Sequence, residues 1–354
     1  MRDAIPIKIL DGGLGTTLET NYGVKFSEAT PLWSSHLLLT DHDRRTLLDC
    51  QSSFAAAGAD IITAATYQVS IDGFRNTKTE NWPHGVSLPN ISQFLQDAIL
   101  IARTAADESG ATVALSLGPY GATMTPSTEY TGQYDVDPQR SMADKLFDWH
   151  NERFSLYAKI PGLLLNVSYI AFETVPRFDE ILAIRRLLDG TRLSVPVWIS
   201  VLFPGDDDKM PDGTSIEHAV AGMVSKEFGR FAPQFVGINC TRVSKLDRLL
   251  GKFATAVQGL VAAGAVSHWP GLVLYPDGTR EGEKYNTETK EWETSGEVSG
   301  KEKDEGVSWE LELAKVVKEA STSGHWSSIV VGGCCRTTPE NISSLREALV
   351  VDEE

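Results

Sequence analysis

Short apolar runs alternate with longer segments of helical spacing from one end of the chain to the other. This alternation is typical of βα units that build a parallel sheet. The apolar runs predict eight strands, at Ile7–Leu10, Ile61–Ala64, Val113–Ser116, Tyr169–Phe172, Val197–Val201, Phe235–Ile238, Leu272–Tyr275 and Ile329–Val331. Eight such units favour an α/β fold, a (β/α)₈ TIM barrel, and we expect residues 1–354 to form a single domain.

The segments between the predicted strands carry apolar residues at positions i, i+3, i+4 and i+7, the spacing of an amphipathic helix. Three helices are well marked, by Leu47, Leu48, Phe54 and Ala55, by Ile181, Ile184, Leu187 and Leu188, and by Trp309, Leu313, Val316, Val317 and Ala320. Their apolar faces are expected to pack on the outside of the barrel.

Two polar stretches interrupt the pattern and predict loop insertions, one near 76–90 and one near 277–306. A long connection without apolar periodicity is usually functional or disordered. We expect the second stretch to be a partly ordered loop over the mouth of the barrel, anchored by Tyr285 and Trp292.

The charge of the chain narrows the range of partners. A formal net charge of −16 and a pI near 4.9 argue against binding to nucleic acid or to an anionic membrane surface. No apolar run reaches the roughly 18 residues of a membrane helix, and the amino terminus has no hydrophobic signal region. The sequence therefore predicts a cytoplasmic protein.

Polar and reactive residues follow the predicted strands, at the end where barrels of this type carry their chemistry. The first strand leads into Asp11-Gly12-Gly13, the fourth into Glu173, the sixth into Asn239-Cys240 and the eighth into Gly333-Cys334-Cys335. Thr338 and Pro339 then mark the start of a helix. The adjacent cysteines are thus expected in a strand-to-helix loop.

Cys240, Cys334 and Cys335 form a candidate zinc site at this end of the barrel. Zinc takes thiolate ligands at about 2.3 Å in tetrahedral geometry, and three protein ligands leave one position open for substrate. The alternative is that these are ordinary buried cysteines at strand ends. Cys50, in an amphipathic segment, is expected to be packed in the core.

Asp11, Gly12, Gly13 and Glu173 suggest a clamp for an amino acid. A carboxylate at a strand end can hold an ammonium group, and glycine N–H groups in a turn can bind a carboxylate. The alternative for Asp11-Gly12-Gly13 is a tight turn with a capping aspartate. The glycine spacing does not match a nucleotide-binding loop.

Taken together, these motifs resemble the homocysteine S-methyltransferase family over nearly the whole chain. The resemblance rests on Asp11-Gly12-Gly13-Leu14-Gly15-Thr16-Thr17-Leu18-Glu19, Leu32-Trp33-Ser34, Gly58-Ala59-Asp60, Tyr67-Gln68, Gly118-Pro119-Tyr120-Gly121, Phe172-Glu173-Thr174, Gly237-Ile238-Asn239-Cys240 and Gly332-Gly333-Cys334-Cys335-Arg336-Thr337-Thr338-Pro339. It implies that Zn²⁺ is the cofactor and that Cys240, Cys334 and Cys335 are its catalytic ligands. It further implies that homocysteine is bound by Asp11, Gly12, Gly13, Glu173 and Asn239.

The resemblance implies methyl transfer from S-methylmethionine or S-adenosylmethionine to the zinc-bound homocysteine thiolate, which forms methionine in a step of methionine biosynthesis. The first alternative is a betaine-dependent or other thiol methyltransferase on the same zinc barrel. Two further alternatives are a barrel protein with a closed structural zinc site and a barrel enzyme such as an aldolase, in which the cysteines are incidental.

Overall fold

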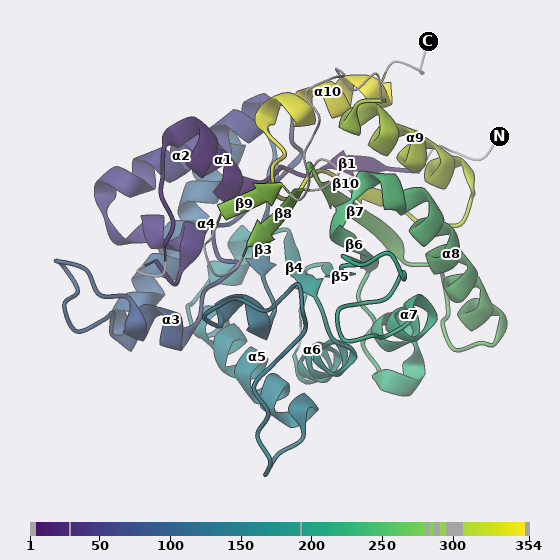
Figure 1. Cartoon of the computed structure of the whole chain (residues 1–354), viewed down its shortest axis with the longest axis horizontal. Helices are drawn as coiled ribbons and strands as arrows, with labels where there is room; N and C mark the ends of the chain where they lie inside the picture. The colour runs from purple at the N-terminus through teal and green to yellow at the C-terminus, as the bar shows by residue number, and fades with distance from the viewer. Residues whose placement is uncertain are drawn as a thin grey trace.

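The computed structural model describes residues 5–27, 30–191, 193–279, 283–286, 291–294 and 307–350. Within these ranges, one sheet contains the parallel strands β1 (Ile7–Ile9), β2 (Ile61–Thr63), β3 (Thr112–Leu117), β4 (Tyr169–Val175), β5 (Val197–Val201), β6 (Phe235–Arg242), β7 (Gly271–Asp277) and β10 (Ile329–Val331). The order β1-β10-β7-β6-β5-β4-β3-β2 places β1 and β2 at its two ends, and a parallel bridge between Leu10 and Ile61 joins those ends. The predicted TIM barrel is confirmed (Figure 1).

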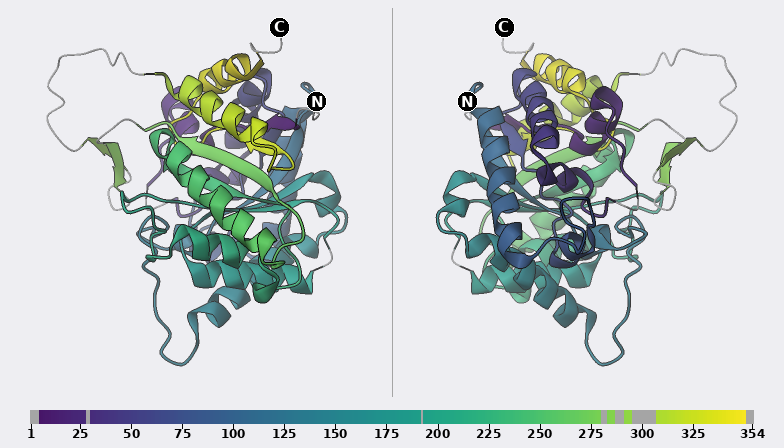
Figure 2. Two further views of the ribbon diagram at one scale, coloured as in Figure 1. Left: turned by 90° about the vertical axis from the view of Figure 1, so that its right-hand side faces the viewer. Right: turned by 90° about the vertical axis from the view of Figure 1, so that its left-hand side faces the viewer.

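Helices surround the strands (Figures 1 and 2). They are α1 (Leu14–Tyr22), α2 (Asp41–Ala56), α3 (Ile71–Asn76), α4 (Leu88–Asp107), α5 (Met142–Ala158), α6 (Phe178–Gly190), α7 (Ile216–Val224), α8 (Leu246–Ala262), α9 (Trp309–Thr322) and α10 (Pro339–Val350), with short 3₁₀ turns η1 (Trp33–Leu39), η2 (Tyr120–Thr123), η3 (Leu163–Asn166), η4 (Lys226–Phe228) and η5 (Val243–Lys245). The last helix begins at Pro339, as predicted, so the adjacent cysteines lie in the loop between β10 and α10.

Two layers of apolar side chains form most of the core, and a small third cluster contains Tyr134, Leu146 and Ala183. The larger layer lies between the strands and the surrounding helices and includes Cys50, which is fully buried in α2 as predicted. The smaller layer fills the inside of the barrel, where Leu10, Ala171, Trp198, Val273 and Val330 pack together. Side chains pointing inward from several strands make the barrel a packed core rather than a pore. The reacting groups must therefore lie beyond this plug, at the strand ends.

Each predicted strand coincides with an observed one, but β4, β6 and β7 continue past the predicted ends. The extensions contain polar residues, and the pairing register shifts between Phe172 and Val175 and between Asn239 and Arg242. Such irregularities re-aim side chains at the rim of a barrel. The last residues of β4 therefore include Glu173, and those of β6 include Asn239 and Cys240, although the sequence predicted all three just after the strands.

The two polar stretches differ from one another in structure. Residues 77–87 connect α3 to α4, which begins at Leu88 because Pro89 suits the first turn of a helix. The second stretch contains an antiparallel hairpin of β8 (Glu283–Asn286) and β9 (Glu291–Thr294), located beyond the end of β7 (Figure 2). Tyr285 and Trp292 face each other in its register, while their side chains lie outside the described part of the structure.

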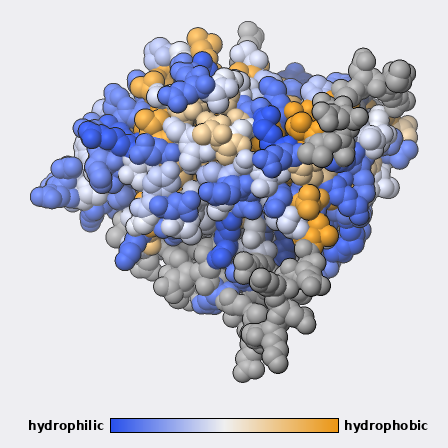
Figure 3. All heavy atoms as spheres, turned by 90° about the horizontal axis from the view of Figure 1, so that it is seen from above, coloured by the Kyte–Doolittle hydropathy of each residue, from blue (hydrophilic) through white to orange (hydrophobic). Residues whose placement is uncertain are grey.

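The described part of the face seen in Figure 3 is predominantly polar. Viewed from above, hydrophilic residues cover most of the described surface and hydrophobic ones appear in small separate groups (Figure 3). Among the described residues, no helix has the length and apolar character needed to cross a membrane.

Candidate metal and substrate site

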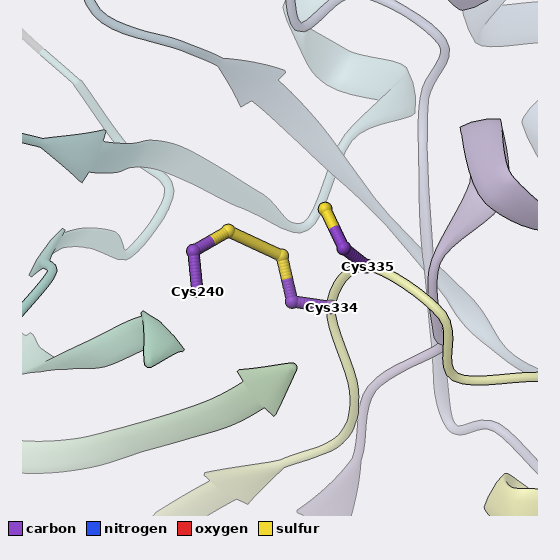
Figure 4. A group of neighbouring side chains, drawn as sticks. All are labelled: Cys240, Cys334 and Cys335. Atoms are coloured by element: carbon purple, nitrogen blue, oxygen red, sulfur yellow. A yellow bond between two sulfur atoms is a disulfide. The ribbon is translucent and has the colours of Figure 1, made fainter. Parts of the chain in front are cut away.

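Cys240, Cys334 and Cys335 converge at the carboxyl end of the barrel, as predicted. Their Sγ atoms all lie within 4.8 Å of one another. A disulfide joins Cys240 to Cys334, whose Cα atoms are 5.7 Å apart, and Cys335 is a free thiol beside it (Figure 4). The three cysteines come from β6 and from the loop after β10, so the barrel brings together sulfur atoms that are distant in the sequence.

Backbone hydrogen bonds hold the loop of adjacent cysteines against neighbouring strands. Cys334 N donates to Pro276 O at 2.9 Å, and Cys335 O accepts from Gly278 N at 2.8 Å. Gly333 N donates to Asp11 O at 3.0 Å. A Cβ atom on Gly333 would lie 2.1 Å from Thr337 Oγ1, which explains the glycine at this position. Both cysteines of the loop are thus held in place by the ends of β1 and β7.

Cys240 is held in a left-handed backbone conformation, with φ of 46°, and Thr174 has φ of 59°. Backbone strain of this kind in non-glycine residues costs about 1–3 kcal/mol each and concentrates at functional sites. Asn239 bridges the two strands: its Oδ1 accepts from Thr174 N at 2.9 Å, and its Nδ2 donates to Thr174 Oγ1 at 2.7 Å and to Cys240 Sγ at 3.3 Å. Asn239 therefore orients the sulfur atom of Cys240.

Direct contact between Asn239 and substrate, in contrast, has no support in its position. The residue is fully buried, and it is not among the described residues that line the cavity beside the cysteines. Its predicted role in binding substrate stays a prediction, while its observed contacts make it a positioning residue for Cys240.

Asp11 and Glu173 face the cavity that contains the cysteines, and both are nearly inaccessible to solvent. Asp11 Oδ2 accepts hydrogen bonds from Thr63 N at 2.7 Å and from Thr63 Oγ1 at 2.9 Å. Glu173 Oε1 accepts a hydrogen bond from the Ser116 hydroxyl. Burial raises the pKa of Asp11 to about 7, with a contribution from the nearby Glu173, and burial also raises the pKa of Glu173. Two such carboxyls form a strong site for a cation.

The glycine turn after β1 joins this cavity to the cysteine loop. Gly13 N donates to both Thr337 O and Thr337 Oγ1 at 3.0 Å, so this N–H is already used within the protein. Gly12 N has no hydrogen-bond acceptor among the described residues, and no side chain caps the amino terminus of α1. The open N–H groups of the turn and of the first turn of α1 are a site for a carboxylate.

Sequence reasoning assigned no role to several other residues that line the cavity. Trp33 and Tyr67 contact each other edge to face at 6.1 Å between ring centroids, and Tyr130 OH lies 3.9 Å from Cys335 Sγ. Glu129 adds a further carboxyl. Trp33 and Tyr67 occur in the family motifs, which is the one signal that could have pointed to them. Glu129 lies in an irregular segment without periodicity.

The charged side chains that line the cavity are all acidic. Four carboxyl side chains line it, those of Asp11, Glu19, Glu129 and Glu173, and none of the described lining residues is lysine, arginine or histidine. Such a cavity favours positively charged ligands.

Arg153, in α5, holds together the loops that follow β2 and β3. Its guanidinium is buried and donates to Gly118 O at 2.6 Å, Thr66 O at 3.0 Å and Tyr67 O at 2.6 Å. We expect Arg153→Met to reduce the free energy of unfolding by roughly 3–5 kcal/mol, because three buried carbonyls lose a charged donor. Urea denaturation measures this change.

Arg186→Met is the matched control for that experiment. Arg186 bonds Asp144 at 2.7 Å, but both side chains are more than half exposed. We expect the free energy of unfolding to change by less than about 1 kcal/mol. An Arg153→Met protein as stable as this control would show that the three carbonyls do not depend on the guanidinium.

The donor set fits zinc once the disulfide is reduced. Three thiolates from a rigid strand end and a tied loop, with sulfur atoms within 4.8 Å, match the tetrahedral sulfur sites in which Zn–S distances are about 2.3 Å. Cys335 is itself poorly suited to ionise alone, since burial and the nearby Asp277 raise its pKa to about 12. A bound metal cation would reverse that preference.

The structure is thus a TIM barrel with three clustered cysteines and an acidic cavity at its carboxyl end, where the chemistry of this fold class takes place. The family model described as homocysteine S-methyltransferase matches residues 8–349, and the chain belongs to this family.

Curated relatives agree with this assignment. Homocysteine S-methyltransferase 1 of Arabidopsis thaliana is 29% identical over 96% of this chain and 93% of its own length. Selenocysteine Se-methyltransferase of Brassica oleracea var. italica is 30% identical over 97% and 88%. The oxidized form of the homocysteine methyltransferase MmuM from Escherichia coli is 25% identical, with a TM-score of 0.65 over 96% of this chain and 95% of that one.

Proposed function

We propose that this protein transfers a methyl group from S-methylmethionine, or from S-adenosylmethionine, to the thiol of homocysteine, and that it binds the zinc ion for this reaction through Cys240, Cys334 and Cys335. The observation that carries the proposal is the single cavity in which three converging cysteines lie beside the buried carboxyls of Asp11 and Glu173. Membership of the homocysteine S-methyltransferase family supports the acceptor.

When bound, zinc would supply a lower pKa for the acceptor thiol, and the thiolate is the nucleophile in methyl transfer. Asp11 and Glu173 would accept hydrogen bonds from the ammonium group of homocysteine. The N–H of Gly12 and those of the first turn of α1 would face its carboxylate. These contacts hold the thiol at the cysteine cluster, and fixed placement of reactants removes much of the entropic barrier.

The charge of the cavity supports a sulfonium donor. Both candidate donors carry a positive charge on sulfur and leave as neutral thioethers, and the cavity has four carboxyls and no basic side chain among its described lining residues. Betaine also carries a positive charge and is therefore the second candidate donor. The 30% identical relative named for selenocysteine adds one alternative acceptor, which is offered in place of homocysteine with Se-methylselenocysteine as the product to measure.

The test is methionine formation by the purified, reduced and zinc-loaded protein, with S-methylmethionine, S-adenosylmethionine and betaine offered separately. We expect turnover with at least one sulfonium, and loss of that turnover when a chelator removes the metal and its return when zinc is added back. Turnover with betaine alone would contradict the proposal that the methyl donor is a sulfonium. Stoichiometric zinc without turnover of homocysteine or selenocysteine would contradict the proposed reaction.

A further inference from the structure

Glu129 is a buried carboxyl in the cavity for which the proposed function gives no role. Its side chain is 7% exposed, and its Oε2 has no hydrogen-bond partner among the described residues. The backbone N–H of Glu129 and the Ser127 side chain are the groups that stabilise its ionised form. Burying a carboxylate without a charged partner is costly, so the ionised side chain lacks a cation that a ligand would supply.

The segment that carries Glu129 is held in place by the rest of the barrel. Thr128 N donates to Gly121 O at 2.9 Å, and Gly132 N donates to Thr128 O at 2.8 Å. Arg177 Nη1 donates to Gly132 O at 2.8 Å from the other side. The carboxyl is therefore presented to the cavity by a tied loop, as a binding site requires.

Glu129 comes from a different part of the chain than the acidic pair at the strand ends. Asp11 follows β1 and Glu173 lies in β4, whereas Glu129 belongs to the irregular segment between η2 and α5. Burial raises the pKa of Glu129 to about 7. The cavity thus has carboxyls beyond the Asp11 and Glu173 pair, and homocysteine, with one ammonium group, cannot pair with all of them. Of the other two, Glu129 is buried and Glu19 is only half-buried.

The neighbours of Glu129 connect its position to the cysteines. Tyr130 follows it in the chain and places its hydroxyl 3.9 Å from Cys335 Sγ, while Tyr67 and Trp33 present aromatic rings to the same cavity. Aromatic faces attract cations such as sulfonium and ammonium groups. A ligand bound here would extend from the cysteine cluster toward Glu129.

We propose that Glu129 binds the α-ammonium group of the methyl donor, so that the donor is itself an amino-acid sulfonium. The inference rests on the proposed function. In the transfer, the bond from the sulfonium sulfur to its methyl carbon breaks, its electron pair stays on the departing sulfur, and the acceptor thiolate forms the new bond to the methyl carbon. The sulfonium loses its charge in this step, so a carboxylate against it would favour the ground state, whereas an ammonium group keeps its charge throughout.

The test compares wild-type protein and Glu129→Gln with two donors. S-methylmethionine has the ammonium group, and 3-dimethylsulfoniopropionate has a sulfonium and a carboxylate without it. For Glu129→Gln we expect the KM for S-methylmethionine to rise roughly 100-fold with kcat changed by less than about threefold. The KM or inhibition constant for 3-dimethylsulfoniopropionate should be the same in both proteins.

Zinc content, homocysteine binding and the unfolding temperature of Glu129→Gln should match those of the wild type. Glu152→Gln, at an exposed position on α5, is the matched control and should leave both donor constants unchanged. An unchanged KM for S-methylmethionine would overturn the inference, and so would an equal loss with both donors, which would place the carboxylate at the sulfonium. A wild-type protein that uses no sulfonium would instead overturn the proposed function.

Discussion

Cys240→Ser is expected to abolish both zinc retention and methionine formation. A serine hydroxyl is a far weaker zinc ligand than a thiolate, and the two remaining cysteines cannot complete a three-ligand site. Even substitution of a residue that only hydrogen-bonds a metal ligand lowers metal affinity roughly 10–100-fold, so the loss of a ligand itself should lower it by more than about 100-fold. Metal analysis after dialysis and a methionine assay measure the two effects on the same sample.

Cys50→Ala is the matched control for the loss of a thiol. Cys50 is fully buried in α2, within the layer between helices and strands. Its substitution should lower stability modestly and leave stoichiometric zinc and turnover in place. A Cys240→Ser protein that remains zinc-loaded and active would refute the three-cysteine site.

Asp11→Asn is expected to weaken homocysteine binding roughly 100-fold or more while zinc stays bound. The amide can still accept the two hydrogen bonds from Thr63, but it no longer offers a charge to the substrate ammonium. The measurement is the KM for homocysteine at saturating donor. A KM within about threefold of the wild type would remove Asp11 from the substrate site.

Although Asp11→Asn weakens substrate binding, it should stabilise the metal-free protein relative to the wild type as the pH rises. Folding raises the pKa of Asp11 from 3.8 to about 7, so the folded state binds this proton more tightly than the unfolded chain does. The contribution of Asp11 to stability therefore falls as pH rises through that interval. The Asp11→Asn protein does not lose this stability. The difference between its free energy of unfolding and that of the wild type should therefore increase between about pH 4 and pH 8. A constant difference across this range would contradict the raised pKa.

The barrel and its cysteine site were accessible from the sequence because both depend on local pattern. Each buried strand is a short apolar run, and Ile329–Val331 followed by Gly332, Gly333 and two cysteines predicts a strand that delivers thiols to a loop. The carboxyl ends of all barrel strands lie on one face, so the alternation of strands and helices predicts that Cys240 and Cys334 lie on the same face.

The remaining features depend on contacts that local pattern does not encode. The register shifts that set Thr174 and Cys240 in a left-handed conformation arise from pairing between strands. Glu129 is buried only because other segments surround its irregular loop. The antiparallel pairing of β8 with β9 could not be predicted because the sequence around these strands is almost wholly polar. The hairpin is linked to the cysteine loop by an ion pair, in which Arg336 Nη2 lies 3.4 Å from Glu283 Oε1.

The position of β10 has a consequence for the synthesis of the protein. This strand inserts between β1 and β7, although it is the last of the barrel to leave the ribosome, and the loop after it carries two of the three cysteines. Cys240 is made 94 residues before Cys334 and lacks both partner thiols until then. The nascent chain thus cannot assemble the cluster early, and the proposed binding of zinc by all three cysteines would mark a barrel that has closed.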